Sequence, residues 1–531
     1  MKWQSRFAYG EELYLQKGIR LFASVLSAAI SGMEVCPVQV EADVSSGLPC
    51  FTMVGFPSTQ VKEAQDRVRT ALKNNGISLP PKKVTVNLAP ADLRKEGAGF
   101  DLPVAAAVLA ASGFIEPQLL RNVMVVGELS LNGEVRSVSG VLPRVIRARE
   151  LGCRYCIIPF ENLAEGALVK DMKVVGVQNI KEVLKLVSDP DAFGKENQFS
   201  EVNSEENQVE ESLVDFGEIC GQESARRAAE IAVSGFHNIL FIGPPGTGKT
   251  MLAKRIPTIM PSLTFEESLE LTKIYSIAGL LSPKRPLIKA RPFRSPHHTS
   301  SSAALAGGGR IPGPGEVTLA HRGVLFLDEM PEFARGSLEV LRQPLEDKQI
   351  QLSRASGTYV FPAGFILVAA MNPCPCGYYP DMNKCRCTPG EVSHYLHKLS
   401  QPLLERIDLC ADVPPVNFSQ ISEEKPGESS ALIRKRVEKA RRIQQKRYQN
   451  EKICFNGELS GKQIRKYCVL TENAFQVAKN AFELMELSAR SYHRILKVSR
   501  TIADMEGEEL IHTRHVAEAL TYKAFDKKYR S

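Results

Sequence analysis

The stretch Gly243-Pro244-Pro245-Gly246-Thr247-Gly248-Lys249-Thr250 decides how this chain of 531 residues is expected to fold. It has the pattern G-x-x-x-x-G-K-T of a phosphate-binding loop. The apolar run Asn238–Ile242 in front of it has the length of a buried strand, and Met251–Arg255 behind it can begin a helix. The sequence therefore predicts strand, loop and helix in the order that nucleotide binding requires; a glycine-rich turn is the simpler alternative.

The chemistry expected at this loop is the binding of ATP with Mg²⁺. Glycines let backbone N–H groups turn toward phosphate oxygens, and the dipole of the following helix favours negative charge. Lys249 would reach the β- and γ-phosphates, and the Thr250 hydroxyl would hold Mg²⁺. Two carboxylates follow a second buried run in His321–Glu329: Asp328 is placed to orient the Mg²⁺ shell, and Glu329 to polarise the attacking water.

Two further residues are candidates for catalysis. The apolar run Phe365–Ala370 leads to Asn372, whose amide could position the water or sense the γ-phosphate, or could only form a turn before a proline. Arg406 follows a Leu-Leu pair. It is either a solvated cation or an arginine finger supplied to a neighbouring subunit, and the second interpretation requires a ring.

Length and composition limit the classes of protein to which this chain can belong. The length suggests about three domains, and 43% hydrophobic residues are ample for a core. A formal charge of +7 permits nucleic-acid binding without arguing for it. The 12 cysteines do not form the framework of a small secreted domain, so we expect a cytoplasmic protein. No apolar run is long enough to cross a bilayer, and no membrane partner is expected.

The pattern along the chain is α/β in its first part. Val38–Ala42 and Lys83–Asn87 alternate like half-buried strands, Thr59–Asn74 has helical spacing, and Pro103–Ala111 reads as a buried helix. An acidic, polar stretch then separates this part from the phosphate loop. The expected domains are an N-terminal extension (1–21), an α/β domain (22–187), an acidic linker (188–216), an ATPase core (217–415) and a helical C-terminal part (416–531).

Four cysteines cluster inside the ATPase core. Cys374 and Cys376 form one C-x-C pair, and Cys385 and Cys387 form another. Four thiolates suit tetrahedral Zn²⁺, and a loop can bring two ligand pairs together. Because C-x-C is tighter than the usual C-x-x-C, reduced thiols, a disulfide and an iron–sulfur site remain alternatives.

Three elements are candidates for contact with DNA phosphates. The segment 294–314 is rich in Gly, Ser, Pro and His and is long for a loop in a compact domain. Gln349–Phe361 is expected to form a hairpin with Arg354 near its tip, although an ordinary surface hairpin is the alternative. Ala431–Tyr448 forms a strongly basic helix, which is either a solvated face or a phosphate contact.

The N-terminal α/β domain resembles the Lon protease family. The likeness lies in Lys95–Phe100 and Gly127–Val135. The serine nucleophile of that family would fall near Gly99 and its lysine near Leu142. Neither side chain can form or activate a nucleophile, so the resemblance implies a fold without peptidase activity.

The central and C-terminal parts resemble the AAA+ ATPases, in the branch of magnesium chelatase and the MCM helicases. The narrower resemblance is to the YifB/ComM group of magnesium-chelatase-like proteins, through Phe293–Ser302, Gly307–Glu316 and Asn372–Gly377. It implies an α/β fold made of an AAA+ motor, an inactive Lon-like domain and a C-terminal helical lid. By analogy Arg406 is the finger, and Arg490 is the second sensor, with Arg494 as its substitute.

This resemblance implies a homo-hexamer with an ATP site shared between subunits. It also implies DNA as a partner, contacted without sequence specificity, and a ComM-like helicase that drives branch migration during recombination of incoming DNA. One alternative is a chelatase-type ATPase that remodels a protein partner for metal insertion. Another is an ATP-switched scaffold with slow turnover.

Overall fold

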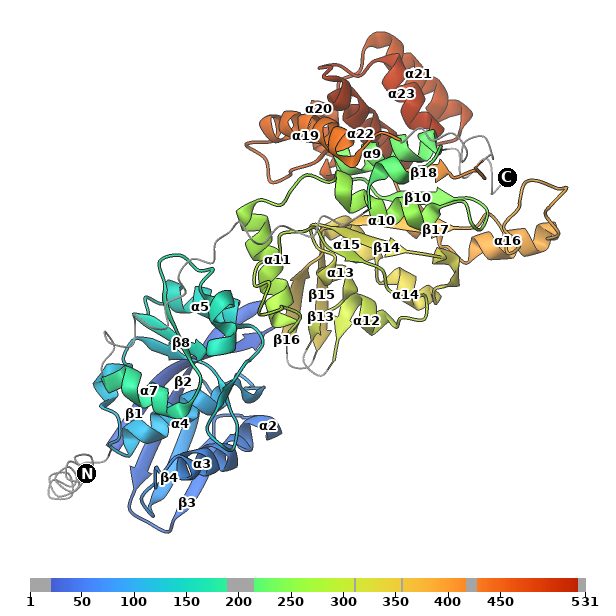
Figure 1. The fold of residues 1–531 in the computed structure, drawn as a ribbon. Helices are drawn as coiled ribbons and strands as arrows, with labels where there is room; N and C mark the ends of the chain where they lie inside the picture. The colour runs from blue at the N-terminus through green and yellow to red at the C-terminus, as the bar shows by residue number, and fades with distance from the viewer. Residues whose placement is uncertain (1–20, 189–213, 310–311, 355–356, 417–426, 524–531) are drawn as a thin grey trace. The chain divides into compact units, whose positions relative to one another are not determined.

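The computed structural model describes residues 21–188, 214–309, 312–354, 357–416 and 427–523 (Figure 1). Nearly all of the expected extension 1–21 and most of the expected acidic linker lie outside these ranges. The described chain forms two compact units. The first contains the residues up to 188 together with Thr272–Leu287, and the second contains the remainder from 214 onward. Nothing in the sequence indicated that 272–287, which lies beyond the phosphate loop, packs with the N-terminal unit.

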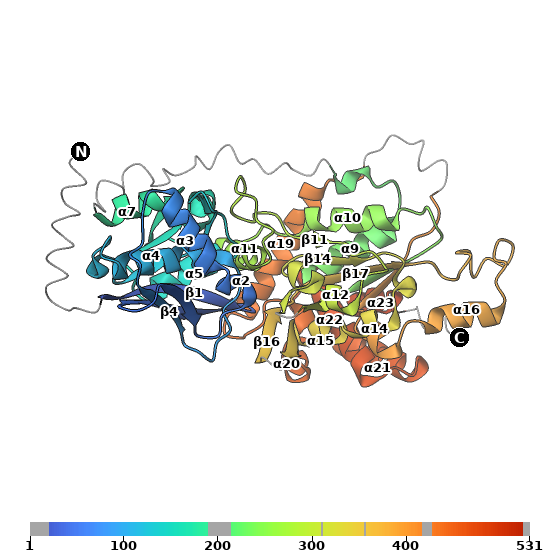
Figure 2. The ribbon, with the colours of Figure 1, turned by 90° about the horizontal axis from the view of Figure 1, so that it is seen from below.

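The first unit is built on a seven-stranded mixed sheet in the order β3-β4-β2-β1-β5-β8-β9. Helix α4 (Asp101–Ala111) packs on β1 and β2, and all its residues are buried, as its alanine-rich sequence predicted. Figure 2 shows α3 (Ala64–Asn74) beside it. The strands are β1 Leu21–Ser31, β2 Glu34–Ser45, β3 Cys50–Val54, β4 Lys83–Ala89, β5 Val123–Val125, β8 Tyr155–Pro159 and β9 Lys173–Val177.

Short elements complete this unit. The helices α2 (Thr59–Lys62) and α3 cover the stretch predicted to be helical, and α5 (Val141–Glu150) carries the position of the missing protease lysine. The remaining elements are β6 Glu128–Leu129, β7 Val135–Arg136, α6 Leu163–Gly166 and α7 Ile180–Ser188.

The second unit is built on a five-stranded parallel sheet in the order β11-β14-β17-β10-β18. All residues of its three inner strands are buried, as their continuous apolar runs predicted. Figure 2 shows α10 (Lys249–Ile259) on one side of the sheet and α14 and α15 on the other. The elements are β11 Phe293–Arg294, β14 Val324–Leu327, β17 Ile366–Met371, β10 Ile239–Ile242, β18 Leu409–Asp412, α9 Glu223–Gly235, α14 Arg335–Glu339 and α15 Arg342–Asp347. The mixed α/β class with a parallel sheet is thereby confirmed.

The C-terminal part is helical and shares the core of the sheet. Ile433 and Val437 of α19 and Ile502 of α22 belong to the same buried apolar cluster as Ile239 and Phe241 of β10. The basic helix predicted from sequence is α19, and Figure 1 shows it and α22 against α9. The helices are α19 Ser430–Arg447, α20 Gly461–Tyr467, α21 Glu472–Leu484, α22 Ala489–Glu506 and α23 Thr513–Thr521.

Helix α11 Phe265–Ile277 begins in the second unit and ends in the first. The remaining elements belong to the second unit. They are α12 Ser302–Ala306, β12 Gly307–Gly308, β13 Gly313–Pro314, α13 Glu316–Leu319, the hairpin of β15 Gln349–Arg354 and β16 Gly357–Pro362, α16 Pro389–His397 and α17 Gln401–Leu404. Within the described ranges no helix combines the length and apolar character needed to cross a membrane.

Candidate active site

The phosphate loop connects β10 to α10 in the predicted order. Gly246 and Gly248 adopt positive φ angles of 77° and 91°, which favour glycine and shape the loop. The Lys249 ammonium donates to the carbonyl oxygens of Gly243 and Pro244, each at 2.7 Å, and to Asn372 Oδ1 at 3.1 Å. Burial lowers the pKa of Lys249, while the carboxylates of Asp328 and Glu329 oppose this shift. The lysine therefore lies at the centre of a group of polar side chains from three strands.

The two acidic residues follow β14, next to the helix after the loop. The Thr250 hydroxyl donates to Asp328 Oδ2 at 2.7 Å, so the two predicted Mg²⁺ ligands are already adjacent. Hydroxyl and carboxylate oxygens are ligands that Mg²⁺ prefers, and the donor set therefore fits this ion. Glu329 has a φ of 49° and a side chain 61% exposed, which leaves its carboxylate facing solvent.

Parallel strands place these groups at one edge of the sheet. The loop follows β10, Asp328 follows β14, and Asn372 follows β17, each at the carboxyl end of its strand. Because carboxyl ends of parallel strands meet at one edge, the sequence order alone could anticipate this constellation.

Arg406 lies at the opposite end of the strands, where their amino ends meet. It precedes the amino end of β18, which pairs in parallel with β10 from Leu409 opposite Ile239 onward. Its guanidinium is bound to Glu346 and to the carbonyl of Pro402. Four residues of strand separate the two edges by roughly 13 Å. Arg406 is thus not among the groups that the chain gathers around its own loop.

The two candidate sensor arginines lie beside Arg406. Arg490 Nη1 is 3.4 Å from Glu405 Oε2, and its side chain is 70% exposed. Arg494 is buried and donates to the carbonyl of Leu404 at 3.2 Å and also to that of Ile407. Arg494 therefore holds the segment that carries Arg406, whereas Arg490 is the one that faces outward.

The four cysteines come together as expected. One sulfur from each of Cys374, Cys376, Cys385 and Cys387 lies within 4.8 Å of the others. The Sγ of Cys374 is 3.3 Å from that of Cys376 and 3.8 Å from that of Cys385. Tetrahedral zinc with Zn–S bonds near 2.3 Å would hold its sulfurs about 3.8 Å apart, so the spacing fits that ion.

The cysteine cluster packs against the phosphate loop, which the sequence did not reveal. A Cβ at Gly377 would lie 2.5 Å from Pro245 Cδ, so only glycine fits here. The backbone N–H of Gly377 also donates to Cys374 Sγ at 3.2 Å. Cys374 itself follows Asn372 by two residues. The cluster therefore borders the nucleotide site on two sides.

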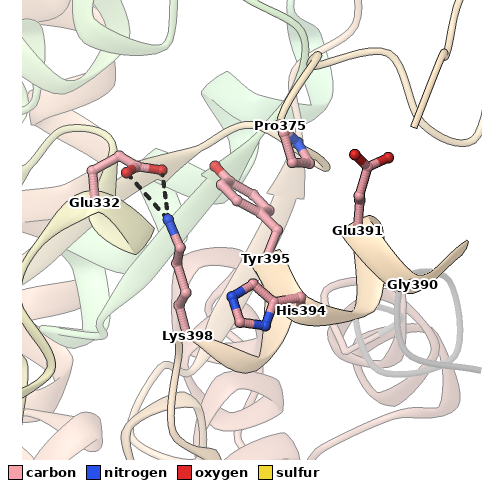
Figure 3. Close-up of a pocket in the computed structure, with 7 residues that line it drawn as sticks. All are labelled: Glu332, Pro375, Gly390, Glu391, His394, Tyr395 and Lys398. Atoms are coloured by element: carbon pink, nitrogen blue, oxygen red, sulfur yellow. Dashed lines mark hydrogen bonds and ion pairs between the residues drawn. The ribbon is translucent and has the colours of Figure 1, made fainter. Parts of the chain in front are cut away.

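A cleft of about 320 Å³ adjoins the cluster (Figure 3). Lys398 at its edge donates to both carboxylate oxygens of Glu332, at 3.1 and 3.2 Å, and the Tyr395 ring lies beside this pair. Burial raises the pKa of Tyr395, and Glu332 adds to the shift, while the backbone of Asn372 opposes it. Tyr395, in the wall of the cleft, therefore lies near the backbone of Asn372.

The basic helix divides into two faces. Four of its arginines bind groups within the same molecule. Arg434 donates to the carbonyl oxygen of Thr258 at 2.9 Å, and Arg436 pairs with Glu230 and Glu428. Arg441 pairs with Glu267 at 3.1 Å, and Arg447 pairs with Asp504 at 2.7 Å. The other four cations are exposed and form no ion pair within the described residues. We name them the α19 stripe: Lys435, Lys439, Arg442 and Lys446.

The structure also describes most of the other two segments that the sequence offered as DNA contacts. β15 and β16 form the predicted hairpin, and Arg354 is exposed next to the turn, whose residues 355 and 356 lie outside the described ranges. The segment 294–314 contains α12 and the short pair β12–β13, and its residues 310 and 311 lie outside the described ranges.

The N-terminal unit carries no nucleophile at the position where the resemblance would place one. A Cβ at Gly99 would lie 3.8 Å from Val126 and Val138 and 4.0 Å from the Arg144 guanidinium. The backbone N–H of Leu142 donates to Glu165 Oε1 at 2.8 Å, and Glu165 also accepts from the Ser276 hydroxyl. The carboxylate there therefore caps α5 and holds the segment 272–287.

The parallel sheet, its phosphate loop and the residues at its carboxyl edge define an AAA+ ATPase of the magnesium-chelatase type. Three family models match the chain: "Magnesium chelatase, subunit ChlI" over 215–421, "Subunit ChlI of Mg-chelatase" over 40–162 and "Magnesium chelatase, subunit ChlI C-terminal" over 427–523.

Similar proteins narrow the family. The competence protein ComM of Haemophilus influenzae is 44% identical, with 94% of this chain and 97% of ComM covered. The uncharacterized protein YifB of Escherichia coli is 43% identical, with 95% and 97% covered. The chain belongs to the YifB/ComM family of magnesium-chelatase-like proteins. A shorter match, 30% identical over 33% of this chain and 38% of the relative, is to the DNA repair protein RadA of Listeria monocytogenes.

Proposed function

We propose that this protein hydrolyses ATP with Mg²⁺ as a hexameric ring and uses the energy to move along DNA, as a ComM-like branch-migration factor. One observation supports the ring: Arg406 and the phosphate loop lie at opposite ends of the strands of one parallel sheet. A finger that cannot reach its own nucleotide can serve that of a neighbouring copy.

Each residue at the carboxyl edge has a role in this proposal. Lys249 and the loop backbone would bind the phosphates, and Thr250 and Asp328 would hold Mg²⁺, whose positive charge would offset that of the phosphates. Asn372 and Glu329 orient the attacking water, and Glu329 takes its proton. Arg406 and the exposed Arg490 of the adjacent copy stabilise charge that develops on the γ-phosphate.

Three features support DNA as the substrate. ComM and RadA are named for competence and DNA repair, and both resemble this chain. The hairpin β15–β16 presents Arg354 at its exposed end. The α19 stripe repeats at intervals of four, three and four residues, so its cations follow one helix face over roughly 16 Å. Cations in such a row suit phosphates without reading base sequence.

The decisive experiment for the function is ATP turnover with and without single-stranded, duplex and branched DNA. The proposal expects turnover to rise with DNA, most with branched forms. Turnover indifferent to all three would remove DNA as substrate and favour a chelatase-type motor acting on a protein partner. Tight ATP binding with almost no turnover under any condition would favour the switched scaffold.

Replacing all four cations of the α19 stripe with glutamine should weaken DNA binding and should also reduce the dependence of binding on salt. Each phosphate contact with duplex DNA contributes about 0.9 to the slope of log K against log salt, so four lost contacts should lower the slope by about 3.6. Fluorescence anisotropy over a salt series measures this directly, and ATP turnover without DNA should stay unchanged.

A charge-matched control separates this surface from net charge. Four exposed cations outside α19 that form no ion pair within the described residues can be replaced in the same way: Lys452, Lys462, Arg465 and Lys479. Their loss should leave the slope nearly intact. An equal fall in both variants would show a non-specific effect of charge and would exclude the stripe as a contact.

We further propose that the cysteine cluster holds structural zinc. Metal analysis should find about one zinc per chain, because four thiolates complete one tetrahedral site. Replacing both Cys385 and Cys387 with serine should abolish this zinc. The same change should lower the melting temperature, since the cluster packs on the phosphate loop through Gly377. A fully folded wild-type protein free of metal would contradict the proposal.

A further inference from the structure

One side chain approaches the carboxylate of Glu329. The Nδ1 of His298 lies 4.0 Å from Oε2 of Glu329. Within the described part of the chain, no hydrogen bond or other ion pair holds this carboxylate. A left-handed backbone and a mostly exposed side chain leave Glu329 with little else to fix its direction.

His298 is itself held in place by packing. Its ring lies 4.1 Å, centroid to centroid, from that of His297 and meets the ring of Phe333 edge-on at 6.5 Å. The Ser337 hydroxyl donates to the carbonyl of Ser300 at 3.0 Å and ties the following residues to α14. The imidazole therefore has a defined position from which it can act on Glu329.

An ion pair between Arg294 and Glu316 ties the segment that carries His298 to the residues that follow it. Arg294 forms two hydrogen bonds of 2.7 Å to the two carboxylate oxygens of Glu316. A bidentate pair of this kind fixes orientation as well as distance. The chain is thus anchored on both sides of His298, by Arg294 before it and by Ser300 after it, although its sequence reads as an irregular loop.

We propose that His298 is a positioning residue for Glu329. A small rotation of either side chain closes the gap to a hydrogen bond from the ring N–H to Oε2. The other carboxylate oxygen then faces the attacking water. This inference rests on the proposed role of Glu329 in hydrolysis and adds the group that directs it.

Replacing His298 with alanine should lower kcat about tenfold and leave KM for ATP nearly unchanged, because an undirected base spends less time in the reactive geometry. Glutamine can offer an N–H at similar reach, so His298→Gln should recover most of the rate. His397→Ala is the control, since this exposed histidine at the end of α16 bonds the Ser393 carbonyl, and it should keep kcat within about twofold of wild type.

A double-mutant cycle tests whether His298 acts through Glu329. In a Glu329→Gln background, His298→Ala should lower the residual rate no further, because the group it directs has lost its function. An unchanged or raised kcat in His298→Ala alone, or an undiminished tenfold loss in the Glu329→Gln background, would overturn the proposal. Full turnover by Glu329→Gln alone would instead refute the role of Glu329, whatever His298 does.

Discussion

Glu329→Gln should bind ATP as tightly as the wild type and hydrolyse it about 10²–10⁴-fold more slowly. Glutamine keeps the size of the side chain but cannot accept a proton from the attacking water, and general-base catalysis contributes a factor of this order. The phosphate loop, Thr250 and Asp328 are untouched, so affinity should survive. A fluorescent ATP analogue measures binding, and phosphate release measures turnover.

Lys249→Ala provides the contrast on the same site. It removes the cation that lies against Asn372 and the loop carbonyls, so ATP affinity itself should fall. If Glu329→Gln lost binding along with turnover, its carboxylate would be holding the nucleotide or Mg²⁺ rather than the water. If it kept its turnover, a different residue would act on the water.

Under the proposed function, Arg406→Ala should have the larger effect, with turnover lower by about 10³–10⁵-fold, the range that an arginine finger contributes. Arg406 lies at the opposite end of the parallel strands from the phosphate loop of its own chain, so ATP affinity should change little. Loss of its ion pair with Glu346 and its bond to Pro402 should cost some stability locally.

The neighbouring Arg342 provides the control for that change. It lies on α15 and pairs with Glu339 at 2.8 Å, so Arg342→Ala removes a cation from the surface around Glu346 without changing Arg406. Its turnover should remain close to that of the wild type. Equal losses in the two variants would assign the effect to this surface in general rather than to Arg406.

The fold followed from sequence wherever a pattern had one physical cause. Continuous apolar runs before Gly243, Asp328 and Asn372 had to be buried strands, and parallel strands brought their ends together. The alanine-rich run up to Ala111 had no polar face and could only be a buried helix. In each case a local rule and the tertiary structure agreed.

The remaining features depend on contacts that no local rule contains. The spacing of residues in the sequence cannot tell at which end of the strands Arg406 lies, because that depends on how β18 pairs with β10. The closeness of Gly377 to Pro245 and of His298 to Glu329 joins residues far apart in the sequence. The segment 272–287 carries no compositional change that separates it from the ATPase core, yet it packs with the N-terminal unit.

The basic helix α19 could be predicted from the sequence, but the roles of its individual cations could not. Its charge pattern could not distinguish cations used in internal ion pairs from cations left on the surface. Arg436 and Arg447 bind carboxylates of other elements, whereas the stripe does not. Only the positions of Glu230 and Asp504 in the folded chain separate the two sets.

Mixing two inactive variants tests most directly whether the ATP site is shared. Glu329→Gln subunits keep Arg406, and Arg406→Ala subunits keep Glu329, so each lacks one half of a site. In mixed rings, some junctions join the intact halves, and ATP turnover should rise well above that of either variant alone. A mixture that forms rings but stays as inactive as its components would contradict a site built between neighbouring copies.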